Sequence, residues 1–374
     1  MPLRKLFSCF LVVGLLSPLT ESQAQSVFQG LEPLFTVPKK YTAYFTQAEP
    51  IIDGKLNDGI WQQVEWSEGF QDIEGDLKPK PSLDTRVKMA WSSTHLFIAA
   101  EVKEPHVWAT LKDRDQIIYH DNDFEVFLDP ENTTHQYYEI EVNAFNTVFD
   151  LFLPKPYRNG GAAMIPWNLD KLKSAVKVQG TINNPKDLDQ GWTVELAIPF
   201  RSVSMGNKTK VPQDGSLWRI NFSRVQWDTD VQEGQYVKRK DSEGRPLPEH
   251  NWVWSPQGVV NMHFPERWGY LHFTKQKAGT QKVAFSLPYP EQQKNYLWLV
   301  YYRQKEFHAK HKQYAGSPAL LNLQNAGAIE IDGQANQLLV QATDYQFTAT
   351  IKGPDQVLWS INQDGLIQKL NNPL

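Results

Sequence analysis

Acidic side chains alternate with apolar ones in the segment HDNDFEVFLDP, residues 120–130. Successive side chains of a strand point to opposite faces, so a strand here would have one apolar face and one acidic face. The apolar face would carry Phe124, Val126 and Leu128, and the acidic face Asp123, Glu125, Phe127 and Asp129. The segment therefore predicts a strand that contributes both to the core and to a polar site.

The run YYEIEVN, residues 137–143, repeats this alternation and predicts a hairpin with the first strand. If the two apolar faces are buried together, the opposite face gathers Asp123, Glu125, Glu139, Glu141 and Asn143. Like charges at this spacing repel one another unless a cation, an arginine or the hydroxyl groups of a polar ligand compensate them. The alternative interpretation is a solvated outer face.

Paired carboxylates also raise the possibility of glycoside hydrolysis, in which two carboxyl groups about 5 to 9 Å apart flank the scissile bond. Glu125 with Glu141 or Asp121 would be the pair. Serine and zinc hydrolase motifs, GxSxG and HExxH, are absent from the sequence. The alternation of side chains along the strands already explains why acidic residues occur at these positions, so we expect no catalytic residue.

The first 24 of the 374 residues are typical of a secretory signal peptide. Arg4 and Lys5 precede an apolar run, and Ser22-Gln23-Ala24 forms a small-residue cleavage site. We therefore expect a secreted or periplasmic product without cysteine, because Cys9 is removed with the signal. The net charge of −4 offers no basic surface for nucleic acid, and no later apolar run is long enough to span a membrane.

Short alternating segments separated by Gly, Pro, Asn and Asp dominate residues 41–274 and predict an all-β fold, an antiparallel β-sandwich. Trp91, Trp192 and Trp218 fall in phase with aliphatic residues and are expected in its core. Residues 25–40 are interpreted as an N-terminal linker. Residues 275–374 are interpreted as a C-terminal extension with a helix at about 290–312 and then short strands.

Seven segments in order carry a resemblance to a known family. They are IDGKLNDGIW (52–61), DTRVKMAWSSTHLFIAAEV (84–102), DNDFEVFLDP (121–130), EIEVNAFNTVFD (139–150), GWTVELAIPF (191–200), WRINFSRVQ (218–226) and WSPQGVVNMHFPERWG (254–269). Together they resemble the family 9 carbohydrate-binding module over residues 41–274. The resemblance implies a jelly-roll-like β-sandwich that binds sugar, often beside bound calcium, without catalysis of its own.

In that family two tryptophans clamp a sugar ring, and a glutamate, an arginine and an asparagine bind its hydroxyls. The resemblance places Glu125 and Asn143 on the glutamate and asparagine, and Tyr119 on the first tryptophan. It departs from the pattern at Glu141, on the arginine position, and at Met262, on the second tryptophan. The predicted ligand-binding residues are Tyr119, Asp121, Glu125, Glu141, Asn143, Met262 and Trp268.

Oxygen ligands for a structural calcium could come from Asp113, Asp115, Asp121 and Asp123, although their spacing is not that of an EF-hand. The sequence requires no other cofactor. The function expected is non-catalytic binding of a poly- or oligosaccharide, accessory to carbohydrate catabolism. The alternatives are a glycoside hydrolase and a structural or adhesive surface protein that has lost sugar binding.

Overall fold

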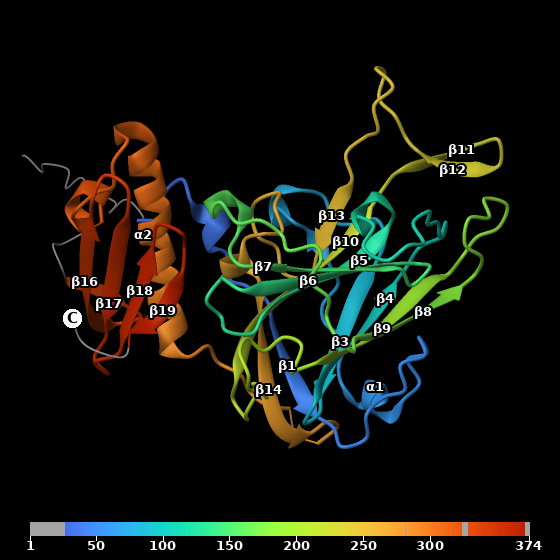
Figure 1. Ribbon diagram of the computed structural model, residues 1–374, viewed down its shortest axis with the longest axis horizontal. Helices are drawn as coiled ribbons and strands as arrows, with labels where there is room; N and C mark the ends of the chain where they lie inside the picture. Colours follow the sequence, from blue (N-terminus) through green and yellow to red (C-terminus); the bar gives the residue numbers. More distant parts are fainter. Residues whose placement is uncertain (1–26, 281, 324–327, 371–374) are drawn as a thin grey trace, which may run out of the picture.

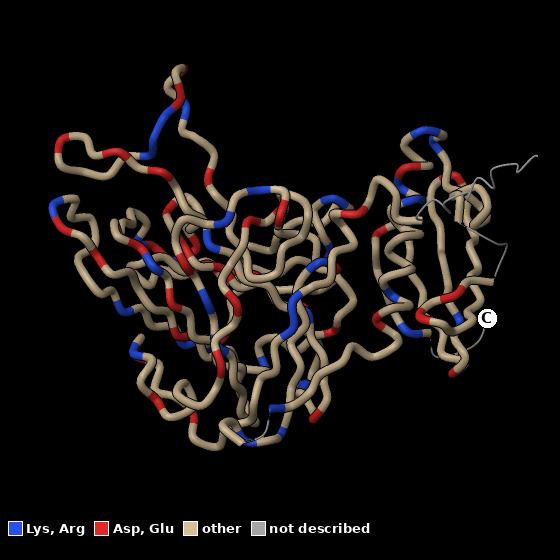
Figure 2. Tube along the Cα trace, turned by 180° about the vertical axis from the view of Figure 1, so that it is seen from behind, with Lys and Arg blue, Asp and Glu red and all other residues tan. Residues whose placement is uncertain are grey.

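The computed structural model describes residues 27–280, 282–323 and 328–370. The expected signal peptide, residues 1–24, lies outside the described residues. Lysines, arginines and acidic residues are interspersed along the chain trace (Figure 2). No helix in the described ranges combines the length and the apolar character that crossing a membrane requires.

A twelve-stranded sheet forms the larger part of the molecule (Figure 1). Its main path runs β7-β6-β5-β10-β14-β1-β3-β4-β9-β8, with β13 paired to β10 and β2 paired to β13. The strands are β1 (Lys40–Phe45), β2 (Gln71–Asp72), β3 (Thr85–Trp91), β4 (His95–Val102), β5 (Asp123–Asp129), β6 (Tyr137–Asn143), β7 (Val148–Leu153), β8 (Lys173–Gln179), β9 (Gly191–Pro199), β10 (Leu217–Gln226), β13 (His250–Val253) and β14 (Gly269–Lys277). Strand β1 runs parallel to β14 and β3, and the other pairings are antiparallel.

The sheet curls so that its two halves bury their apolar faces against each other. Val87 and Trp91 of β3 share one core cluster with Phe124 and Val126 of β5, as the strand alternation predicts. Trp192 of β9 belongs to the same cluster. The predicted all-β sandwich is therefore confirmed, with parallel pairing confined to β1.

The second face of β5 and β6 is covered as well. All seven residues of each strand are buried. A separate apolar cluster beneath this cover contains Phe127, Tyr137, Met262 and Trp268. The alternative of a solvated outer face is wrong, because chain segments that follow β7 and β13 fold over it.

Short helical elements connect these strands. They are α1 (Gly59–Gln63) and the 3-10 turns η1 (Glu32–Phe35), η2 (Gly75–Leu77), η3 (Ile118–His120), η4 (Tyr157–Asn159) and η5 (Pro265–Arg267). A hairpin of β11 (Thr229–Gln232) and β12 (Gln235–Lys238) projects away from the sandwich (Figure 1). Turns η3 and η4 matter most below, because each presents a tyrosine.

The C-terminal part packs one helix on a five-stranded antiparallel meander (Figure 1). The elements are α2 (Tyr289–His311), η6 (Pro318–Leu321), β15 (Ala328–Ile331), β16 (Gln334–Ala342), β17 (Phe347–Lys352), β18 (Leu358–Asn362) and β19 (Ile367–Leu370). Leu297 and Val300 of α2 are buried against Ile351 of β17. Leu31, ahead of β1, joins the same cluster, so the N-terminal segment contributes to this C-terminal core.

Buried charges join the two parts. The Arg158 guanidinium donates from Nη2 to both carboxylate oxygens of Glu266, at 2.8 Å each. The Tyr302 hydroxyl of α2 donates to the same carboxylate. Because these groups are largely shielded from water and are bonded to one another, they hold α2 in a defined position on the sandwich.

Candidate functional site

A cavity of about 410 Å³ opens over the second face of β5 and β6. Glu125, Glu139 and Glu141 form its floor, and Glu249 also lines it. We call this cavity the acidic pocket. It lies on the face where strand alternation places the carboxylates, and the segments that cover that face form its walls.

Strand register sets the floor. Glu125 of β5 pairs directly with Glu141 of β6, and Glu139 lies two residues earlier on the same face of β6. Each hairpin strand therefore supplies carboxylates at adjacent positions, because side chains two residues apart in a strand point the same way. On the other side of β5, Ser223 of β10 is the direct partner of Glu125.

Burial dominates the electrostatics of the floor. It raises the pKa of Glu125 to about 7. It raises the pKa values of Glu139 and Glu141 well above the ordinary carboxyl range, and the neighbouring Glu125 charge adds to both shifts. Among the described residues no salt bridge joins a lysine or arginine to these three carboxylates. The pocket floor therefore favours a proton or a cation wherever a carboxylate would otherwise be ionised.

Among the described residues that line the acidic pocket, the basic one is His263. His263 Nε2 lies 4.0 Å from Glu139 Oε2, and its Nδ1 lies 3.0 Å from the Tyr137 hydroxyl oxygen. Burial, followed by the nearby Arg158 charge, lowers the pKa of His263 to about 4. The imidazole is therefore neutral at neutral pH and does not compensate the carboxylates.

Two tyrosines stand at the rim. Tyr119 of η3 is 38% exposed and Tyr157 of η4 is 43% exposed, and both line the acidic pocket. Tyr119 is anchored through its backbone, since its N–H donates to Glu141 Oε2 at 2.9 Å and its carbonyl accepts from Trp227 Nε1 at 2.9 Å. Tyr157 meets the His263 ring edge-on, with centroids 4.5 Å apart. Exposed rings held in this way can stack on the apolar face of a sugar.

Four of the seven predicted ligand-binding residues line this pocket. They are Tyr119, Glu125, Glu141 and Met262. The other three, Asp121, Asn143 and Trp268, are fully buried outside its lining.

Asp121 and Asn143 brace the loops beside the hairpin. Asp121 Oδ2 accepts from the backbone N–H groups of Thr110 and Leu111 and from Asn143 Nδ2. Asn143 Oδ1 accepts the N–H of Thr147 and so closes the turn into β7. Their hydrogen-bonding atoms are used within the protein, so their role is to position the strands that carry the glutamates.

Trp268 supports Met262 without lining the pocket itself. Its indole Nε1 donates to the Met262 carbonyl at 2.8 Å, and its ring packs edge-on against Tyr137. Met262 itself has a side chain in contact with the pocket. The tryptophan therefore fixes the wall of the pocket without forming its surface.

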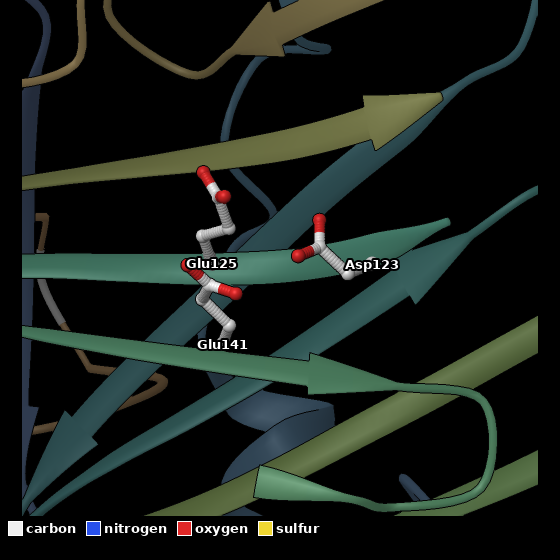
Figure 3. Close-up of side chains that lie close together, drawn as sticks. All are labelled: Asp123, Glu125 and Glu141. Carbon is white, nitrogen blue, oxygen red and sulfur yellow. The ribbon is translucent and has the colours of Figure 1, made fainter. Parts of the chain in front are cut away.

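The residues nominated for a loop calcium site are not brought together as a set. Within the described ranges, the group of acidic side chains that converges consists of Asp123, Glu125 and Glu141, with one oxygen from each within 4.8 Å of the others (Figure 3). Asp113 is exposed on its loop, and Asp121 is occupied as described above. Of the four aspartates, Asp123 alone belongs to the converging group.

Tyr157 and Glu249 were not singled out from the sequence. Tyr157 belongs to the segment KPYRNGG, where proline and two glycines after a strand predict an exposed loop. An aromatic residue in such a loop is the signal that could have drawn attention to it. Glu249 follows a long polar stretch and carries no comparable signal.

A comparison with protein-family models matches residues 52–254 to the family described as carbohydrate family 9 binding domain-like. The chain belongs to this family. Family 9 domains are binding modules. The chain is 26% identical over 165 residues to the exoglucanase XynX of Acetivibrio thermocellus and 27% identical over 165 residues to the endo-1,4-beta-xylanase A of Thermoanaerobacterium saccharolyticum.

Both matches cover 44% of this chain but only 13% and 12% of the two enzymes, so this family 9 chain corresponds to a small part of each. Among solved structures, a family 9 module from Caldicellulosiruptor kristjanssonii in complex with cellotriose is 17% identical. The alignment covers 66% of this chain and 100% of that module, with a TM-score of 0.38. The same module has also been solved with glucose.

Proposed function

We propose that this family 9 protein is a secreted or periplasmic, non-catalytic carbohydrate-binding protein, and that the acidic pocket is its sugar site. The observation that carries the proposal is the position of Tyr119 and Tyr157, two partly exposed rings at the rim of a pocket with a carboxylate floor. Rings supply stacking surface, and carboxylates accept hydrogen bonds from sugar hydroxyls.

Apolar side chains extend the rim. Ile117, Ile165 and Val260 line the acidic pocket and are exposed. Exposed apolar groups collected around one pocket are typical of ligand sites, because a protein gains nothing from leaving them in water. A sugar ring, with apolar C–H faces and a polar edge, matches this combination.

Oligosaccharides of glucose are the first ligands to test, since the Caldicellulosiruptor relative was solved with cellotriose and glucose. Isothermal titration of the purified chain with both sugars, followed by a glycan array, tests the proposal. Saturable binding that weakens when Tyr157 is replaced supports it. No binding on the array would favour the structural or adhesive alternative, in which the fold is kept without its ligand.

Export is tested separately. Mass spectrometry of the protein recovered outside the cytoplasm should find a chain that begins at Gln25 or within a few residues of it. Recovery of exported protein that still contains Cys9 would contradict the predicted cleavage.

A further inference from the structure

Asp123, Glu125 and Glu141 converge beneath the acidic pocket (Figure 3). Each offers an oxygen within 4.8 Å of the other two. Oxygens bound to calcium lie 2.3 to 2.6 Å from the ion, so ligands on opposite sides of it are about 5 Å apart. The three carboxylates therefore already have the spacing of ligands on one calcium ion.

Two buried oxygens, one behind the pocket floor and one on it, lack a hydrogen-bond partner in the described structure. Asp123 Oδ1 accepts from the Val225 N–H at 3.2 Å, whereas Asp123 Oδ2 makes no hydrogen bond. Glu139 Oε2 on the floor makes none either. Both side chains are more than nine-tenths buried. A buried, unpaired carboxylate oxygen is costly, so this second observation indicates a positively charged partner at the floor.

The donor set indicates the type of cation. All three converging groups are carboxylates, with no cysteine or histidine in the group. Hard oxygen donors favour calcium and magnesium over zinc or copper. Calcium tolerates irregular geometry, whereas magnesium demands a near-ideal octahedron, so calcium is the first ion to test.

We propose that Asp123, Glu125 and Glu141 bind a divalent cation of the calcium class, and that this cation contacts the sugar directly. Glu125 and Glu141 line the acidic pocket, whereas Asp123 lies behind its lining. Three carboxylates leave coordination positions of the ion unfilled, and these face the cavity. Hydroxyl or carboxylate oxygens of a sugar can fill them. The cation site depends on the geometry alone, whereas the contact between the cation and the sugar rests on the proposed function.

Titration of calcium chloride into chelator-treated protein, without sugar, tests the cation site. We expect saturable binding of one ion, at least tenfold weaker in Glu141→Gln and in Asp123→Asn. These variants keep the side-chain size and remove a like charge, so they should fold. The matched control is Glu101→Gln, a carboxylate of β4 paired with Arg86 away from the pocket, which should bind calcium like the wild type. Magnesium chloride is expected to bind more weakly.

The cation site is overturned if the wild type shows no saturable binding up to about 10 mM calcium, roughly tenfold above the weakest extracellular calcium modules. It is also overturned if Glu141→Gln and Asp123→Asn both bind calcium as the wild type does. Fold retention is checked in each variant by circular dichroism.

Titrations of glucose, cellotriose and glucosamine with and without calcium test the contact with sugar. Glucose or cellotriose binding that requires calcium supports the contact. Equal binding in chelator overturns the contact while leaving the proposed function intact. If glucosamine binds saturably only when chelator is present, the ligand's own ammonium group occupies the cation position. That result also overturns the contact between calcium and sugar. Calcium binding without any sugar binding supports the cation site and counts against the proposed function.

Discussion

Glu125 and Glu141 are direct cross-strand partners, and both are buried. Directly opposed like charges destabilise a sheet, by up to about 1 kcal/mol at an ordinary position. The hairpin thus keeps an arrangement that costs stability. Such a cost is expected at a binding site, where residues needed for function are kept although they destabilise the local structure.

Glu141→Gln should therefore raise the free energy of unfolding of chelator-treated protein, by up to about 1 kcal/mol. The Gln oxygen can still accept the Tyr119 N–H. Urea denaturation measures the change. Glu101→Gln is the opposite case, because Glu101 pairs across the strands with Arg86, and it should leave stability unchanged or lower it. A loss of stability in Glu141→Gln would contradict the interpretation.

Tyr119→Ala and Tyr157→Ala should each weaken sugar binding by roughly tenfold, since a stacked ring is worth about 0.5 to 1.5 kcal/mol beyond its buried area. Thermal stability should change little, because both rings are partly exposed. Isothermal titration gives the affinities. Tyr345→Ala is the matched control, a tyrosine 87% exposed in the C-terminal meander, and should bind as the wild type does.

Purified protein should not hydrolyse oligosaccharides above background. Glu125 and Glu141 are direct cross-strand neighbours on one floor, and we expect them to bind one ligand group together rather than to act as acid and nucleophile across a bond. A reducing-sugar assay with xylan and cellulose oligomers measures this. Turnover that disappears in Glu125→Gln would favour the hydrolase alternative, since a contaminating enzyme would not respond to that substitution.

Acidification should destabilise the protein through His263. Its pKa is about 4 in the folded state and near 6.5 when unfolded, so the stability it contributes is complete above about pH 6.5 and is lost as pH falls towards 4. The full effect is about 3 kcal/mol. Carboxyls with raised pKa values act in the opposite direction, so the measurement is the difference between wild type and His263→Gln, by urea denaturation at pH 7.5 and 4.5.

The difference between these two proteins should change with pH, and an unchanged difference would show that His263 is not buried as described. His250→Gln provides the comparison. Its side chain is 42% exposed, so this variant shows the effect of replacing a histidine outside the pocket.

Arg158→Ala should destabilise the whole chain by about 3 to 5 kcal/mol, because it leaves Glu266 buried without its cation. The Tyr302 hydroxyl bond alone cannot compensate that charge. Chemical denaturation followed by tryptophan fluorescence measures the loss. Arg245→Ala removes an exposed ion pair with Asp241 and should cost less than about 1 kcal/mol. Equal effects would mean that the junction is not held by this pair.

The sequence by itself determined the sandwich, its core face and the acidic face of the hairpin. Strand alternation is a local property, so Phe124 and Val126 could be assigned to the core, and Glu125 and Glu141 to one surface, without tertiary information. The ordered family 9 segments extended this to residues 41–274, and the family match covers residues 52–254 of that range.

Only the tertiary structure decided what covers that surface. Tyr157 reaches it from the turn that follows β7 and Met262 from the loop that follows β13, and no local pattern records how such segments fold back. The same holds for Asp121 and Asn143, whose polar atoms could have served a ligand but are bonded to the backbone of Leu111. Hydrogen bonds between distant segments form only in the folded chain, and they decide which polar residues remain free to bind.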